Sequence, residues 1–68
     1  MEIKYDSEAD AMYIRIKRGK FHSNQKVDEN TILDLNEEGD LLGIEILFIK
    51  ERNPDFLKEL QEKKMIHA

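Results

Sequence analysis

The chain has 68 residues and a formal net charge of −4, and 38% of its residues are charged. At this length we expect a single domain, residues 1–68, with a small core, because a chain of about 60 residues buries only about 60% of its unfolded surface. The chain has no cysteine, which excludes disulfides and cysteine-rich metal sites, and its negative charge disfavours broad binding to nucleic acid or to anionic membranes.

Three short strands are predicted in the first part of the chain. The first contains Ile3 and Tyr5, and a turn around Ser7 ends it, since Ser and Asp side chains bond to nearby backbone groups. The second, residues 12–17, alternates apolar and polar residues with the period of two that places them on opposite faces of a sheet. The third, residues 21–27, is so polar that we expect it at an edge of the sheet.

Residues 31–49, TILDLNEEGDLLGIEILFI, predict a β-hairpin. If Glu38 and Gly39 form a two-residue loop, the predicted pairs are Leu35 with Leu42, Leu33 with Ile44, Asp34 with Gly43 and Ile32 with Glu45. A slip of one residue would move the apolar side chains to the polar face, so the hydrophobic pattern specifies this register.

The last part of the chain predicts a helix. Asn53 suits an N-cap and Pro54 the first helical position, and an apolar stripe of Phe56, Leu57 and Leu60 follows. We therefore expect a small α+β fold, in which a mostly antiparallel sheet of four or five strands (residues 2–49) carries one C-terminal helix (about 54–65) on one face. The predicted core consists of Met12, Ile14, Ile16, Leu33, Leu35, Ile44, Ile46 and Leu60.

The second face of the predicted sheet also carries apolar residues. They form a candidate protein interface, which comprises Tyr13, Ile32, Leu41, Gly43, Leu47 and Ile49. One helix cannot cover both faces, and an exposed apolar patch often marks a protein–protein surface. The alternative is that these are scattered exposed apolar residues, which are common on protein surfaces.

Two sets of carboxylates could bind a metal or act as acids and bases. Asp6, Glu8 and Asp10 could supply oxygen ligands to Ca²⁺ or Mg²⁺, although they match the EF-hand loop poorly; the alternative is that they cap a turn. Asp34 and Glu45 share a face by the predicted register, so they could perform acid–base chemistry or bind Mg²⁺. The alternative for this pair is a solvated face.

The remaining polar residues predict no cofactor, metal or catalytic site. His22 and His67 are isolated in sequence, and Lys17–Lys20 forms a short basic turn in an acidic chain. The N-terminus has no apolar run after a basic start, and no segment approaches the ~20 apolar residues of a membrane span. We therefore expect a cytoplasmic protein that binds neither nucleic acid nor membranes.

Two stretches, IKYDSEADAMYIRI and VDENTILDLNEEGDLLGIEIL, resemble the DUF2283 family of small bacterial and archaeal proteins. The matching positions are Tyr5, Asp6, Glu8, Asp10, Tyr13, Ile14, Val27, Asp28, Ile32, Leu33, Asp34, Gly39, Leu41, Gly43, Ile44, Glu45, Ile46 and Leu47. The family's function is unknown, so the resemblance implies no catalytic residues. It does imply a small partner of a toxin-like protein, that is, an antitoxin-type binder.

These observations predict a non-enzymatic protein-interaction module. We expect a homodimer, with a small partner protein as a further binding target. The alternative is a metal-dependent hydrolase or nuclease that uses Asp34 and Glu45.

Overall fold

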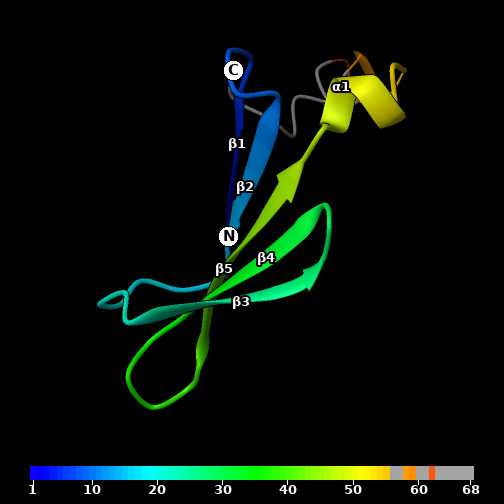
Figure 1. The fold of residues 1–68 in the computed structure, drawn as a ribbon. Coiled ribbons are helices and arrows are strands. Elements are labelled where there is room, and N and C mark those ends of the chain that lie inside the picture. Colours follow the sequence, from blue (N-terminus) through cyan, green and yellow to red (C-terminus); the bar gives the residue numbers. More distant parts are fainter. Residues whose placement is uncertain (56–57, 60–61, 63–68) are drawn as a thin grey trace.

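The computed structural model of the chain describes residues 1–55, 58, 59 and 62. Within those residues five β-strands precede one short α-helix (Figure 1). The elements are β1 (Glu2–Asp6), β2 (Ala11–Arg15), β3 (Ser23–Asp28), β4 (Thr31–Leu35), β5 (Leu41–Leu47) and α1 (Ile49–Arg52).

The five strands form one sheet in the order β1-β2-β5-β4-β3, and every pair of neighbours is antiparallel. The longest strand, β5, is central, and Figure 1 shows it running between the β1–β2 hairpin and the β3–β4 hairpin. The predicted small α+β fold with an antiparallel sheet is confirmed. The strand number is five.

The polar third strand lies at an edge, as its sequence predicted. All residues of β3 except Ser23 are exposed. The strand begins two residues later than predicted, because Phe21 belongs to the preceding loop, where its side chain is 52% exposed. Such an edge tolerates polar residues since neither of its faces is fully covered.

The register of the β4–β5 hairpin is confirmed in its middle and wrong near its loop. Ile32, Leu33 and Asp34 pair with the predicted residues of β5, but Leu35 lies opposite Leu41 instead of Leu42. The shift between Asp34 and Leu35 leaves Leu42 as an extra residue on β5, which is a β-bulge.

The bulge accompanies a longer loop than predicted. The Asn36 N–H donates to the Asp40 carbonyl, and the Gly39 N–H donates to the Asn36 carbonyl, each at 3.0 Å. The loop therefore holds three residues, Glu37–Gly39, rather than two. Gly39 has a φ of +85°, as expected for the last residue of a three-residue hairpin loop.

The core lies on one face of the sheet, which we call the inner face, and is small. Met12 and Ile49 are each 2% exposed and contact one another, and Ile3, Tyr5, Ile14 and Ile46 pack around them half-buried. Of the other predicted core residues, Leu33, Leu35 and Ile44 are half-buried. Leu60 lies outside the described residues.

Three core assignments differ from the prediction. Ile16 is 42% exposed because β2 ends at Arg15, before the alternating pattern ends. Leu42 is 4% exposed, because the bulge turns it toward the loop at Gly19, where a Cβ atom would lie 2.7 Å from its Cδ2. Ile49 was predicted on the opposite face and is instead buried by the helix that it begins.

The structure contains a short helix that was not predicted and that precedes the predicted 54–65 segment. Ile49–Arg52 forms α1, and Asn53 is its C-cap rather than an N-cap. Pro54 and Asp55 form a turn, while Lys58, Glu59 and Glu62 are helical. The other positions of the predicted 54–65 helix lie outside the described residues. Among the described residues, no helix is long and apolar enough to cross a membrane.

Candidate functional site

The face opposite the core, which we call the outer face, brings together most of the residues singled out from the sequence. Directly paired residues of an antiparallel sheet share a face, so the pairing defines two rows across the three central strands. One row is Tyr13, Glu45 and Ile32, and the other is Arg15, Gly43 and Asp34. Leu47 continues the outer face along β5.

The predicted interface is partly assembled on this face. Tyr13, Ile32 and Leu47 are half-buried there. Two predicted members are not on this face. Leu41 lies beyond the bulge and pairs with Leu35, so it shares the face of that core residue. Ile49, at 2% exposed, is enclosed by the core and is not accessible to a partner.

Gly43 was predicted to allow another surface to approach closely, and the structure assigns it a different role. A Cβ atom on Gly43 would collide with the phenol of Tyr13. The ring therefore occupies the space above the glycine, and Gly43 itself is buried. The absent side chain serves a contact within the chain, and the surface presented to a partner is the ring.

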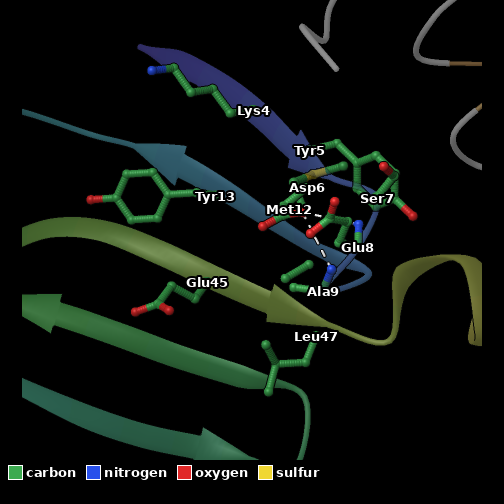
Figure 2. A pocket seen from close by; sticks show the side chains of 11 residues that line it. Lys4, Tyr5, Asp6, Ser7, Glu8, Ala9, Met12, Tyr13, Glu45 and Leu47 are labelled. Atoms are coloured by element: carbon green, nitrogen blue, oxygen red, sulfur yellow. Dashed lines mark hydrogen bonds between the residues drawn. The ribbon is translucent and has the colours of Figure 1, made fainter.

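A groove of about 860 Å³ lies beside this ring, between the β1–β2 turn and β5. In Figure 2, Lys4, Tyr13 and Glu45 stand in a row across β1, β2 and β5, and their polar ends point the same way. Leu47 and Ala9 lie at the other end of the view, together with the polar turn residues Asp6, Ser7 and Glu8. The lining residues are Lys4, Tyr5, Asp6, Ser7, Glu8, Ala9, Ala11, Met12, Tyr13, Glu45 and Leu47.

Asp34 and Glu45 form a carboxyl pair on the outer face, as predicted from the register. They occupy diagonal positions on β4 and β5, because Asp34 pairs with Gly43 and Glu45 with Ile32. A hydrogen bond to Asp34, followed by burial and by the charge of Asp34, raises the pKa of Glu45 to about 7. Asp34 also accepts a 3.0 Å hydrogen bond from the Asn24 amide. The pair therefore holds a proton in the physiological pH range.

The other carboxylate set comprises Asp6, Glu8 and Asp10, and these side chains do not gather around one point. The carboxylates of Asp6 and Asp10 accept hydrogen bonds from backbone N–H groups instead. Asp6 Oδ1 accepts from the N–H groups of Glu8 and Ala9 at 3.0 and 3.3 Å. This bonding closes the β1–β2 turn, which is the turn-capping alternative. Among the residues that the structure describes, no group of three or more His, Cys, Asp or Glu side chains could hold a metal ion.

Asp10 fastens α1 to the sheet, a role that the sequence analysis missed. Its carboxylate accepts from the Lys50 N–H at 2.8 Å and the Glu51 N–H at 3.3 Å, and from the Tyr5 hydroxyl at 2.7 Å. The Lys50 amide contributes most to lowering the pKa of Asp10, and Tyr5 adds to the effect. Phe48, the local N-cap residue, makes no side-chain cap bond, so a carboxylate distant in sequence caps the helix instead.

The basic residues of the Lys17–Lys20 turn and His22, the histidine that the structure describes, do not come together to form a site. Lys17 bonds to Asp40 at 3.1 Å, while Arg15 and Arg18 each lie 3.7 Å from Glu2. These exposed pairs contribute little to stability, but they partly neutralise the cations. His22 is exposed, and His67 lies outside the described residues.

Comparison with known proteins identifies the family. The family described as "Protein of unknown function (DUF2283)" matches residues 2–50 of the 68-residue chain, so the chain belongs to the DUF2283 family. No curated protein and no solved structure matches the chain. The matched region contains all five strands and the start of α1, and therefore the whole outer face.

Proposed function

We propose that this chain is a non-enzymatic protein-interaction module that works as a homodimer. The observation that carries the proposal is how little apolar surface the described residues bury. Their buried apolar side chains are Met12, Leu42 and Ile49, while half-buried apolar residues remain on both faces of the sheet. A five-stranded sheet in this condition gains stability when another protein surface covers it, since burial contributes about 25 cal/mol per Å² of apolar area.

The outer face is the proposed binding surface. The inner face already carries α1, whereas Tyr13, Ile32 and Leu47 have no helix over them among the described residues. The ring of Tyr13 and the side chain of Leu47 offer the partly aromatic, apolar surface that protein interfaces favour. The resemblance to small antitoxin-type binders supports a second target, a small partner protein.

Sedimentation equilibrium of the full chain tests the proposal. We expect a dimer at about 50 µM, a concentration at which ordinary weak association is measurable. Leu47→Glu should yield a monomer, because it places an unpaired charge in a desolvated surface. Val27→Glu is the matched control, since Val27 is 57% exposed on the edge strand. A wild-type chain that stays monomeric and retains no partner from native lysate would contradict the proposal.

A second candidate function has one specific observation in its favour. Glu45, with its pKa raised to about 7, lines the groove beside Tyr13, and a perturbed acid in a groove is a candidate acid–base group. The candidate is a metal-dependent hydrolase or nuclease that uses Asp34 and Glu45. Mg²⁺-dependent cleavage of a phosphodiester substrate, lost in Glu45→Gln and kept in Glu37→Gln, would replace the binding module as the leading function. Glu37 is an exposed loop carboxylate away from the groove.

A further inference from the structure

We infer that the partner on the outer face is a second copy of this chain, docked with β5 over β5, and that the Asp34–Glu45 pair at its centre controls the assembly. The inference rests on the proposed function and deepens it, because it names the partner, the geometry and the regulation.

The charges of the outer face complement themselves across β5. Arg15 on β2 and Asp34 on β4 are both paired with Gly43, one on each side of the central strand. A two-fold axis along β5 exchanges the positions of β2 and β4. Arg15 of one protomer then meets Asp34 of its partner, and the contact occurs twice, as an isologous interface requires.

Neither of these charges is firmly held within the chain. Arg15 is 3.7 Å from Glu2, a loose contact. Asp34 takes part in no salt bridge among the described residues, and its hydrogen-bond partners are the Asn24 amide and the protonated Glu45 carboxyl, which are both neutral. Both groups can therefore pair across an interface without breaking a strong internal bond.

The same axis passes along the apolar part of the face. Leu47 lies on β5 itself, and the ring of Tyr13 leans over Gly43 toward the axis. Two copies would thus bring Leu47 against Leu47 and place the two rings beside the axis. Aromatic pairs of this kind add about 0.5–1.5 kcal/mol to the burial of their area.

The size of the sheet predicts weak association. Five strands about 4.8 Å apart, with about five residues of 3.3 Å each, give a flat footprint of roughly 400 Å² per protomer. Stable specific interfaces bury about 1,200–2,000 Å² in total. Two such footprints bury about 800 Å², which is below this range and corresponds to a weak dimer, so a change of a single charge at its centre decides whether it forms.

Glu45 is that central charge. It lies on β5, so the axis brings it against the same residue of the partner. The groups around it are Asp34 on β4, Tyr13 and Arg15 on β2, and Lys4 and Lys26, which sit at the two edges of the sheet. The two lysines are exposed and solvated at the rim, where they contribute little.

Protonation of Glu45 makes the positive and negative charges of the interface equal in number. When Glu45 is neutral, the positive charge of Arg15 matches the negative charge of Asp34 in each protomer. When Glu45 is ionised, each protomer brings one unmatched negative charge to the axis, and the two repel in a desolvated seam. Assembly therefore strengthens as the pH falls through the Glu45 pKa of about 7.

The size of this effect follows from proton linkage. Two protons are required per dimer, and Glu45 in the free chain is mostly neutral at about pH 6 and mostly ionised at about pH 8. The dissociation constant should therefore be about 100-fold larger at the higher pH. Glu45→Gln should remove this dependence and keep the dimer at both pH values. Glu37→Gln should leave the dependence unchanged, as should His22→Gln, a control for the exposed histidine.

A charge exchange tests the geometry. Arg15→Asp and Asp34→Arg should each raise the dissociation constant at least tenfold at about pH 6, because each places like charges together. An equimolar mixture of the two variants should form a heterodimer, because both opposite-charge pairs are then restored between different chains. Sedimentation velocity of the full chain at about 100 µM measures all of these states. Formation of the heterodimer also shows that both variants are folded.

Four outcomes would overturn the inference. A mixture that stays monomeric at about pH 6 shows that Arg15 and Asp34 do not face one another. A wild-type dimer that neither single variant weakens uses another surface, in which case the proposed function stands and this geometry is wrong. A wild-type chain that remains monomeric at both pH values but retains a partner through the outer face likewise refutes only the self-association. A wild-type chain that forms no dimer and binds no partner refutes the proposed function as well.

Discussion

Ile49→Ala should destabilise the fold of the single chain strongly, although the sequence pattern had placed this residue on an exposed interface. Ile49 is 2% exposed and packs on Met12, which is also 2% exposed. The substitution removes three carbons, each worth about 0.8 kcal/mol when buried, which makes about 2.4 kcal/mol before any cavity term. Incomplete collapse around the gap adds to this, so we expect a loss of about 2–4 kcal/mol in the free energy of unfolding.

Urea denaturation, monitored by circular dichroism, measures the loss in the free energy of unfolding. It should be performed on the dilute chain at about pH 8, so that coupling to self-association stays small. The melting temperature should fall by at least about 8 °C, since about 1 kcal/mol shifts the midpoint of so small a domain by 4–8 °C. Val27→Ala is the control, because Val27 is 57% exposed and should change the stability by less than about 0.5 kcal/mol. If Ile49→Ala behaves like this control and instead weakens dimer formation, the position of α1 is wrong.

Three further outcomes are expected. Gly43→Ala should lower the stability by about 1–3 kcal/mol through its clash with Tyr13, and should be much milder in a Tyr13→Ala background, which a double-mutant cycle by denaturation can establish. Glu45 binds its proton more tightly in the folded chain, so the stability that this proton contributes is complete below about pH 4.5 and is lost as the pH rises to about 7. Glu45→Gln should flatten that part of the profile of stability against pH, and an unchanged profile would show that Glu45 does not carry this proton. The chain should show no submicromolar binding to DNA or RNA at physiological salt, because its net charge is −4; tight binding that weakens with added salt would contradict this.

The sequence predicted most of what depends on period-two alternation. The strands, the edge position of β3 and the central register of β4 and β5 follow from which residues are apolar, because a slip exposes the whole set. The same alternation predicted that Asp34 and Glu45 share one face, and the pairing of β4 with β5 confirms it. The predictions were wrong where the chain departs from that alternation, which is at the bulge beside Leu42 and at the start of α1.

The position of α1 was hidden because its cap is distant in sequence. Asn53–Pro54 is a strong local start signal, whereas the carboxylate that caps Ile49–Arg52 comes from Asp10, forty residues before Lys50. The one available hint was Tyr5, whose hydroxyl needs a partner and lies five residues before Asp10. Single-sequence rules describe neighbours along the chain, so they could assign Asp10 to a turn or to a metal but not to a helix across the sheet.

The carboxylates of this chain differ in what they do for the fold, and this difference supports a role for Asp34 and Glu45 beyond stability. Asp6 closes a turn and Asp10 caps a helix, and hydrogen bonds lower the pKa of Asp10, so its ionised form stabilises the fold. Glu45 shows the opposite, because its neighbour Asp34 raises its pKa, and the two ionised carboxylates oppose folding above about pH 7.

A sheet with so few buried side chains has little stability to lose, and a local arrangement that opposes the fold most often occurs at a functional site. An assembly that must respond to a proton requires an acid with a pKa near neutrality at the centre of its contact surface. Two half-buried carboxyl groups side by side on a sheet face produce such a pKa through their hydrogen bond, their partial burial and their mutual repulsion. The Asp34–Glu45 pair therefore suits the proposed control of an interface, and it contributes nothing to the stability of the fold at higher pH.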